Sequence, residues 1–191
     1  MASASRDVDP FTALGPFDDD SGDLNAVIDT PKGSRNKYKL THGLFALTKI
    51  LPAGAAFPFD FGFVPATLAE DGDPIDVLVL MDAPGFVGCV VPARLIGVIE
   101  AEQEEKGRVI RNDRLIAVAT IARDHHGIDD LAQIHENVVG EIEHFFVSYN
   151  AALGRRFTPT GRGGPRDARA LVDRAASRFE RQARGRRRAH G

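Results

Sequence analysis

The sequence predicts a mainly β domain of the α+β class, in which a small antiparallel barrel or sandwich is followed by helices. Short apolar runs rich in Val, Ile, Leu and Phe alternate with Gly- and Pro-containing turns through residues 24–120. In the last third, apolar residues recur at three- and four-residue spacing, as on an amphipathic helix. The 191 residues, 43% of them hydrophobic, suit one domain with a substantial core.

The β part is expected to contain six short strands. Their turns include Pro-Lys-Gly, Asp-Gly-Asp-Pro, Ala-Pro-Gly and Lys-Gly, and such frequent turns favour a barrel or sandwich over a βαβ repeat. The predicted strands are Ala26–Asp29, Asn36–Leu40, Phe57–Val64, Val77–Met81, Val90–Glu100 and Arg114–Thr120.

Two helices are expected after the strands. The first begins at a cap provided by Asp129 or Asp130 and ends near Gly154, and the second covers Asp167–Arg184. The Gly-rich stretch Gly161–Pro165 lacks the preceding strand and the following Lys-Ser/Thr of a P-loop, so we interpret it as an interhelix linker.

Composition and charge narrow the class of protein. Residues 1–22 are polar and predict a loose arm, residues 23–184 a single domain, and residues 185–191 a basic tail on a chain of net charge −3. This basic end could contact an anionic surface, but a solvated helix end is the preferred interpretation. No apolar run approaches the ~18 residues of a membrane span, no signal peptide precedes the domain, and Cys89 has no disulfide partner. We therefore expect a cytoplasmic protein without a membrane partner.

Three carboxylates crowd one loop just before an apolar strand. Asp71, Asp73 and Asp76 repel one another unless a cation lies among them, and Mg²⁺ prefers oxygen ligands of this kind. Gly72 permits a tight bend and Pro74 restricts the backbone, so the loop can direct the carboxylates towards one point. The alternative is a solvated turn, because Asp-Gly is a common turn pair.

The run Asp71-Gly72-Asp73-Pro74-Ile75-Asp76-Val77 resembles the signature of soluble family I inorganic pyrophosphatases at every position. The resemblance extends from Leu24 to Tyr149 and includes Lys37-Tyr38, Phe57–Phe63 and His144-Phe145-Phe146. It implies a five-stranded closed OB-type β-barrel flanked by helices. It also implies a hydrolase of phosphate metabolism that converts pyrophosphate to two phosphates with two or more Mg²⁺ ions, and, by analogy, a homo-oligomer.

The resemblance assigns roles to individual residues. Asp71 and Asp76 would bind metal, and Asp73 would both bind metal and act as the general base on the attacking water. Further metal positions would fall on Asp29, where a glutamate is usual, and on Asn112 and Glu102. The substrate phosphates would be held by Lys37, Lys49, Arg114 and Tyr149.

Several positions depart from the family pattern. Lys39 replaces an acidic residue, and Phe57 and Phe61 replace tyrosines, so two hydroxyl groups are missing. Asn150 replaces a lysine that usually follows the tyrosine.

Two positions of metal-binding aspartates hold the neutral amides Gln103 and Asn112. Glu102, Glu104 or Asp113 could substitute, and we favour Glu102 over Asp113. A shift of one residue in a strand, however, turns the side chain to the opposite face.

Three functions compete at this point. The leading hypothesis is hydrolysis of inorganic pyrophosphate, and the second is a phosphohydrolase of the same scaffold that acts on another di- or triphosphate. The third is a catalytically weak phosphate- or nucleic-acid-binding module, because OB-type barrels bind oligonucleotides through stacked aromatics. Nucleic acid is disfavoured as a partner, since acidic residues lie beside the phenylalanines.

Overall fold

A computed structural model describes residues 14–189, and their side chains as far as residue 185. The strands are β1 (Leu24–Thr30), β2 (Asn36–Thr41), β3 (Leu44–Ile50), β4 (Asp60–Phe63), β5 (Asp76–Leu80), β6 (Val90–Glu105), β7 (Arg108–Arg111), β8 (Arg114–Ala119) and β9 (Arg156–Gly163). The helices are the 3₁₀ turn η1 (Leu131–Gln133), α2 (Glu136–Ala151) and α3 (Pro165–Ala189).

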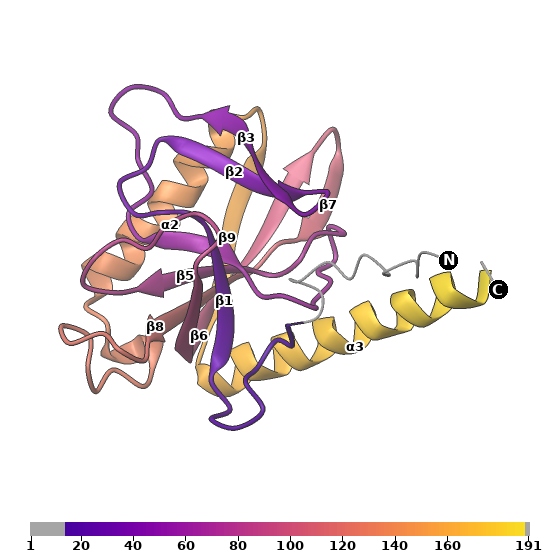
Figure 1. Ribbon diagram of the computed structural model, residues 1–191. Helices are drawn as coiled ribbons and strands as arrows, with labels where there is room; N and C mark the ends of the chain where they lie inside the picture. Colours follow the sequence, from indigo (N-terminus) through magenta and orange to yellow (C-terminus); the bar gives the residue numbers. More distant parts are fainter. Residues whose placement is uncertain (1–13, 190–191) are drawn as a thin grey trace.

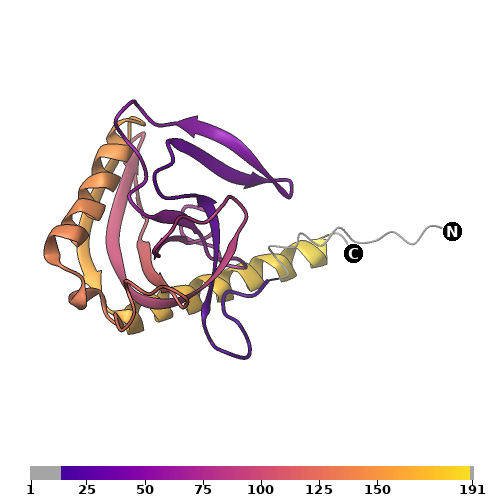
Figure 2. The same cartoon turned by 60° about the vertical axis from the view of Figure 1, so that its left-hand side comes forward.

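Five strands close into a barrel, as predicted. They follow the order β1-β4-β5-β8-β6, and β6 returns to pair with β1. The β5–β8 pair is parallel, whereas the other four pairs are antiparallel. Strands β1 and β8 are buried at every residue, because one face of each lines the interior and the other is covered. The β2–β3 hairpin lies across the barrel from α3 in both views (Figures 1 and 2).

The strand predictions were incomplete. All six predicted strands are present with shifted ends, but β3, β7 and β9 were not predicted. Residues Gly161–Pro165 are not an interhelix linker, because β9 occupies this stretch as far as Gly163 and pairs with the long strand β6. This added strand places the two helices on different parts of the barrel (Figure 1).

The first predicted helix is interrupted. Asp130 does cap a helix, but only the 3₁₀ turn η1, which ends when Ile134 adopts an extended conformation. His135 then caps α2, since its Nδ1 accepts a hydrogen bond from the Asn137 N–H at 3.2 Å. The second helix is longer than predicted and projects beyond the barrel (Figure 1).

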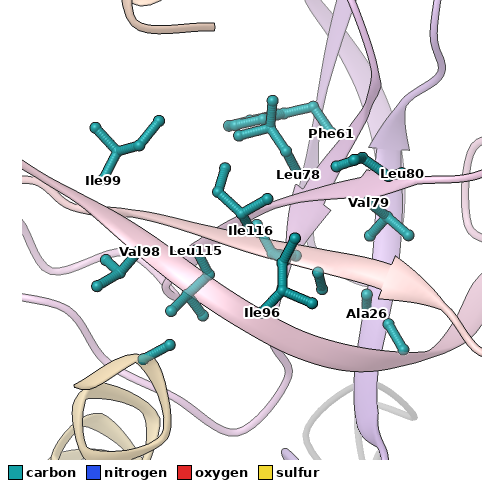
Figure 3. Packing of buried hydrophobic residues seen from close by; sticks show 14 of the residues in the cluster. Ala26, Phe61, Leu78, Val79, Leu80, Ile96, Val98, Ile99, Leu115 and Ile116 are labelled. Carbon is teal, nitrogen blue, oxygen red and sulfur yellow. The ribbon is translucent and has the colours of Figure 1, made fainter. Parts of the chain in front are cut away.

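Apolar side chains fill both faces of the sheet. Val98 and Leu115 point to the side on which α3 lies, whereas Leu78 and Ile116 point the opposite way (Figure 3). A cluster of aromatic rings joins the barrel to α2, with centroid separations of 5.0–5.8 Å. Its members are Phe57, Phe61, Phe145, Phe146, Tyr149 and Phe157. Lys37 lies over Phe57 and Phe61 of this cluster and Arg114 over Phe146 and Phe157, so the rings border residues of the predicted site.

The ends of the chain pack only in part on the domain. Residues 1–13 of the predicted arm lie outside the described residues. Phe17, also in the predicted arm, forms an isolated antiparallel β-bridge with Leu24. The guanidinium carbon of Arg169 lies 3.6 Å from the centroid of the Phe17 ring. Five residues of the predicted basic tail, 185–189, continue α3. None of the helices within the described residues combines the length and the hydropathy that a bilayer crossing requires.

Candidate active site

The acidic loop connects β4 to β5 and is held in one shape by its own backbone. Gly72 has φ +89°, a conformation that an L side chain would strain, so the bend depends on glycine. The Ala69 N–H donates to the Asp73 carbonyl at 2.7 Å, and the Asp73 N–H donates to Asp71 Oδ1 at 3.1 Å. The three aspartates of the loop are therefore positioned before any ligand binds.

Three of the predicted metal-binding carboxylates already face a cation of the protein. Lys37 Nζ lies 2.6 and 2.8 Å from the two oxygens of Asp29. Lys39 Nζ lies 2.8 Å from both oxygens of Asp73, and both side chains of this pair are 55% exposed. Lys39, which replaces an acidic residue of the family pattern, therefore directs its charge at Asp73.

The third pair is buried. Arg114 Nη1 lies 2.7 Å from Asp76 Oδ2, and the Arg114 side chain is only 5% exposed against 28% for Asp76. The guanidinium lies beside the neighbouring rings of Phe146 and Phe157, at 5.0 and 5.2 Å from their centroids. Contact with these rings holds the Arg114 side chain in one orientation, which an arginine at the surface would not keep.

Asp71 is the acceptor that remains for a metal ion. Burial raises its pKa, and the neighbouring carboxylates of Asp76 and Asp73 raise it further. Asp71 is exposed, and it forms no ion pair with any of the described residues. A divalent cation would relieve this repulsion, so the carboxylates of Asp71 and Asp73 in the acidic loop fit one such ion.

The inner end of the site has different chemistry. Asn112 Nδ2 donates to Gln103 Oε1 at 3.0 Å, and Asn112 Oδ1 accepts a hydrogen bond from Arg114 Nη1. Both amides are buried: Gln103 lies on β6, and Asn112 lies in the connection between β7 and β8. Among the side chains described, no three acidic, histidine or cysteine groups gather closely enough to hold a metal ion unaided.

The proposed substitutes for these amides are directed elsewhere. Glu102 is exposed and alternates with buried Gln103 along β6, so the structure does not bring it to the cluster. Asp113 accepts hydrogen bonds from the Ala101 N–H at 3.0 Å and from Arg111 Nε at 2.6 Å. Glu104 is paired with Arg156.

Two of the four predicted phosphate-binding side chains, Lys49 and Tyr149, line the same opening, and the charges of Lys37 and Arg114 act on them. Lys37 and Lys49 face each other across the β2–β3 hairpin, and the Lys37 ammonium lies 4.2 Å from the centroid of Phe61. Burial raises the pKa of Tyr149 to about 12, and the charge of Asp76 adds to this shift, so the phenol remains a hydrogen-bond donor. Arg114 opposes that shift, which shows that these groups share one electrostatic environment.

Sequence reasoning missed one cation at this opening. Arg155 lies close enough to Lys49 to lower its pKa, after the larger effect of burial. Its signal in the sequence was the Arg-Arg pair that follows Gly154. Asn150, which replaces the usual lysine, is a neutral amide and adds no charge here. It is buried, and its Nδ2 donates to the Phe146 carbonyl at 2.9 Å.

Comparison with known proteins gives a consistent result. A family model described as inorganic pyrophosphatase matches residues 26–180. The inorganic pyrophosphatase of Streptomyces coelicolor is 37% identical over 164 residues, which cover 84% of this chain and 98% of that protein. The crystal structure of the inorganic pyrophosphatase from Thermus thermophilus superimposes with a TM-score of 0.80 at 32% identity, covering 89% of this chain and 98% of the other. A structure of an inorganic pyrophosphatase from Neisseria gonorrhoeae gives a TM-score of 0.79 at 29% identity, with coverage of 89% and 98%.

Proposed function

Because the chain belongs to the inorganic pyrophosphatase family, we propose that it hydrolyses inorganic pyrophosphate to two phosphates with the help of a divalent metal. The observation that carries the proposal is the position of Asp71 and Asp73 in the acidic loop, where the two carboxylates are held close together and their charges are not fully neutralised. We assign the metal as Mg²⁺, because it prefers one or two carboxylates completed by water and substrate phosphates.

The roles of the chain's own residues follow from their positions. A bound divalent cation would neutralise charge on the phosphate oxygens and lower the pKa of the attacking water. Asp73 is the proposed general base, since its carboxylate is exposed and its partner Lys39 is an exchangeable surface side chain. Phosphoryl transfer needs little covalent help, so positioning and charge account for most of the rate.

The cations around the opening are the proposed phosphate ligands. Lys37 and Lys49 would hold one phosphate from the hairpin side, while Arg114 and neutral Tyr149 would hold the other from the barrel side. Asp29 keeps Lys37 in place through two short contacts, so we assign it a positioning role in addition to any contact with metal.

Phosphate release tests the proposal directly. Pyrophosphate, a nucleoside triphosphate and a phosphomonoester are compared at equal concentration, with Mg²⁺ or with EDTA. We expect release from pyrophosphate that depends on Mg²⁺ and exceeds release from the other two substrates. Release that EDTA does not abolish, or a preference for the monoester, contradicts the proposal.

A second substrate class is favoured by one observation. A cavity of about 250 Å³ lies beside Lys49 and Tyr149, and most of its lining is apolar. The lining includes Leu51, Pro52 and Phe145. This space suits the organic group of a substituted diphosphate, and the nucleotide arm of the assay tests it.

We also propose that the protein acts as a homo-oligomer in the cytoplasm. The oligomer follows by analogy with the family, and Cys89 as the single cysteine suits a reducing compartment. Sedimentation of the purified chain measures its oligomeric state.

A further inference from the structure

The two ends of the site differ in charge: the outer end has an excess of negative charge, and the inner end is balanced. The outer end carries Asp71 and Asp73, whose carboxylates repel each other; the exposed Lys39 pairs with Asp73, and Asp71 feels the charge of Arg114 without an ion pair among the described residues. The inner end carries no carboxylate without a cation, because Asp76 is paired with Arg114 and the nearby Asp29 with Lys37, while Gln103 and Asn112 are neutral amides. A divalent cation therefore meets attraction at one end only.

Arg114 is fixed at the inner end more firmly than an ion pair alone requires. Nη1 bonds Asp76 Oδ2 at 2.7 Å, the Asn112 side chain, and the Asp113 carbonyl at 3.1 Å. The guanidinium also packs against the neighbouring rings of Phe146 and Phe157. Nε is buried and has no hydrogen-bond partner in the described part of the chain. A group held this way does not leave when a cation arrives.

Resting on the proposed function, we propose that the Arg114 guanidinium serves as a built-in cation in place of an inner metal ion. The chain then holds one divalent cation, at Asp71 and Asp73, in the absence of substrate. Arg114 supplies the second positive charge towards the substrate phosphate. A guanidinium suits this task, because it is planar, always charged, and binds phosphate through paired N–H groups.

The amides next to Arg114 support the same assignment. Asn112 Oδ1 accepts from Arg114, and its Nδ2 passes the chain of hydrogen bonds on to Gln103. A carboxylate at position 112 would form an ion pair with the fixed guanidinium, and so would not recruit a metal. With the neutral amide, Arg114 keeps part of its charge available for substrate.

Counting bound Mn²⁺ by the EPR signal of the free ion tests the inference without any measurement of activity. We expect one tightly bound Mn²⁺ per chain for the wild type and for Asn112→Asp. The double variant Asn112→Asp/Arg114→Gln exposes two carboxylates at the inner end, so it should bind a second ion. Arg156→Gln, which removes an exposed arginine from β9, is the control for the loss of one arginine charge and should still bind one.

Each outcome decides a different question. Two or more tight ions in the wild type, or a second ion in Asn112→Asp with Arg114 intact, overturns the inference even if the double variant does not fold. A wild type that binds one Mn²⁺ but fails to hydrolyse pyrophosphate leaves the metal count standing and removes the proposed function. A wild type that binds two ions and hydrolyses pyrophosphate does the reverse.

Discussion

Replacing Asp71 or Asp76 by asparagine makes the same chemical change at two points of one loop, and we expect opposite effects on stability in metal-free buffer. Asp71 is a carboxylate whose charge is unfavourable, because burial and its acidic neighbours raise its pKa. Asp76 is the acidic partner of the buried Arg114. Asp71→Asn removes a repulsion, while Asp76→Asn leaves a buried guanidinium without its counter-charge.

The magnitudes differ because the two environments differ. Breaking a buried ion pair by removing one partner costs about 3–5 kcal/mol, which we reduce to roughly 2–4 kcal/mol because water reaches Asp76. For a chain of this size that lowers the melting temperature by about 4–16 °C. Relief of repulsion at exposed Asp71 is worth roughly 0.2–1 kcal/mol, a rise of up to about 4 °C.

Thermal unfolding in EDTA at pH 7.5, repeated with millimolar Mg²⁺, measures both effects. The wild type should gain stability from Mg²⁺ by preferential binding to the native state, and Asp71→Asn should lose most of that gain. A folded-state pKa above the ordinary 3.8 means that Asp71 costs stability as pH rises through that value, so the two curves should approach each other towards pH 4. A destabilised Asp71→Asn in EDTA would refute the electrostatic reasoning.

Three further predictions concern single residues. Asp73→Asn should lower turnover by roughly 10²–10⁴, the usual contribution of a general base, while Mg²⁺ still raises the melting temperature. Lys39→Ala should lower the Mg²⁺ concentration for half-maximal stabilisation by up to about fivefold, since it releases Asp73 from an exposed pair; no change would mean that Lys39 does not compete with the cation. Because the pKa of Tyr149 is raised to about 12, wild-type stability should fall as pH rises from about 10 towards 12, and denaturant titrations of Tyr149→Phe should show a shallower fall.

The strands could be predicted where turns and apolar runs were distinct, but β3 and β7 were missed. The Lys-Gly turn was recognised in the sequence, whereas the short strand β7 that follows it was not. The β2–β3 turn is His42-Gly43 with φ +52° and +75°, and the β6–β7 turn is Lys106-Gly107 with φ +52° and +78°. Both have positive φ at two successive residues, a conformation for which Asn-Gly is the strong sequence signal. Strand β3 is mainly exposed, so its apolar alternation carried little information.

The acidic loop could be recognised because its seven signature residues are contiguous, but the pairing of its charges could not. The ion pair between Lys39 and Asp73 joins residues that are 34 positions apart in the sequence, and only the folded chain brings them into contact. From the sequence alone, an acid restored at position 112 should reduce the Mg²⁺ requirement. The structure changes that expectation, because Arg114 already donates to Asn112 and would pair with the new charge.

The exchangeability of the two cations that face the loop determines where a metal can enter. Lys39 is half exposed and paired at the surface, where such pairs are worth about 0–1 kcal/mol, so an arriving divalent ion can displace it. Arg114 is buried against two neighbouring rings, and its displacement would leave its charge unpaired in the interior. Binding at Asp71 and Asp73 therefore releases a lysine into solvent and leaves the arginine in position. In the proposed mechanism this places the attacking water at the outer end, beside Asp73, and directs the substrate phosphates towards the fixed guanidinium.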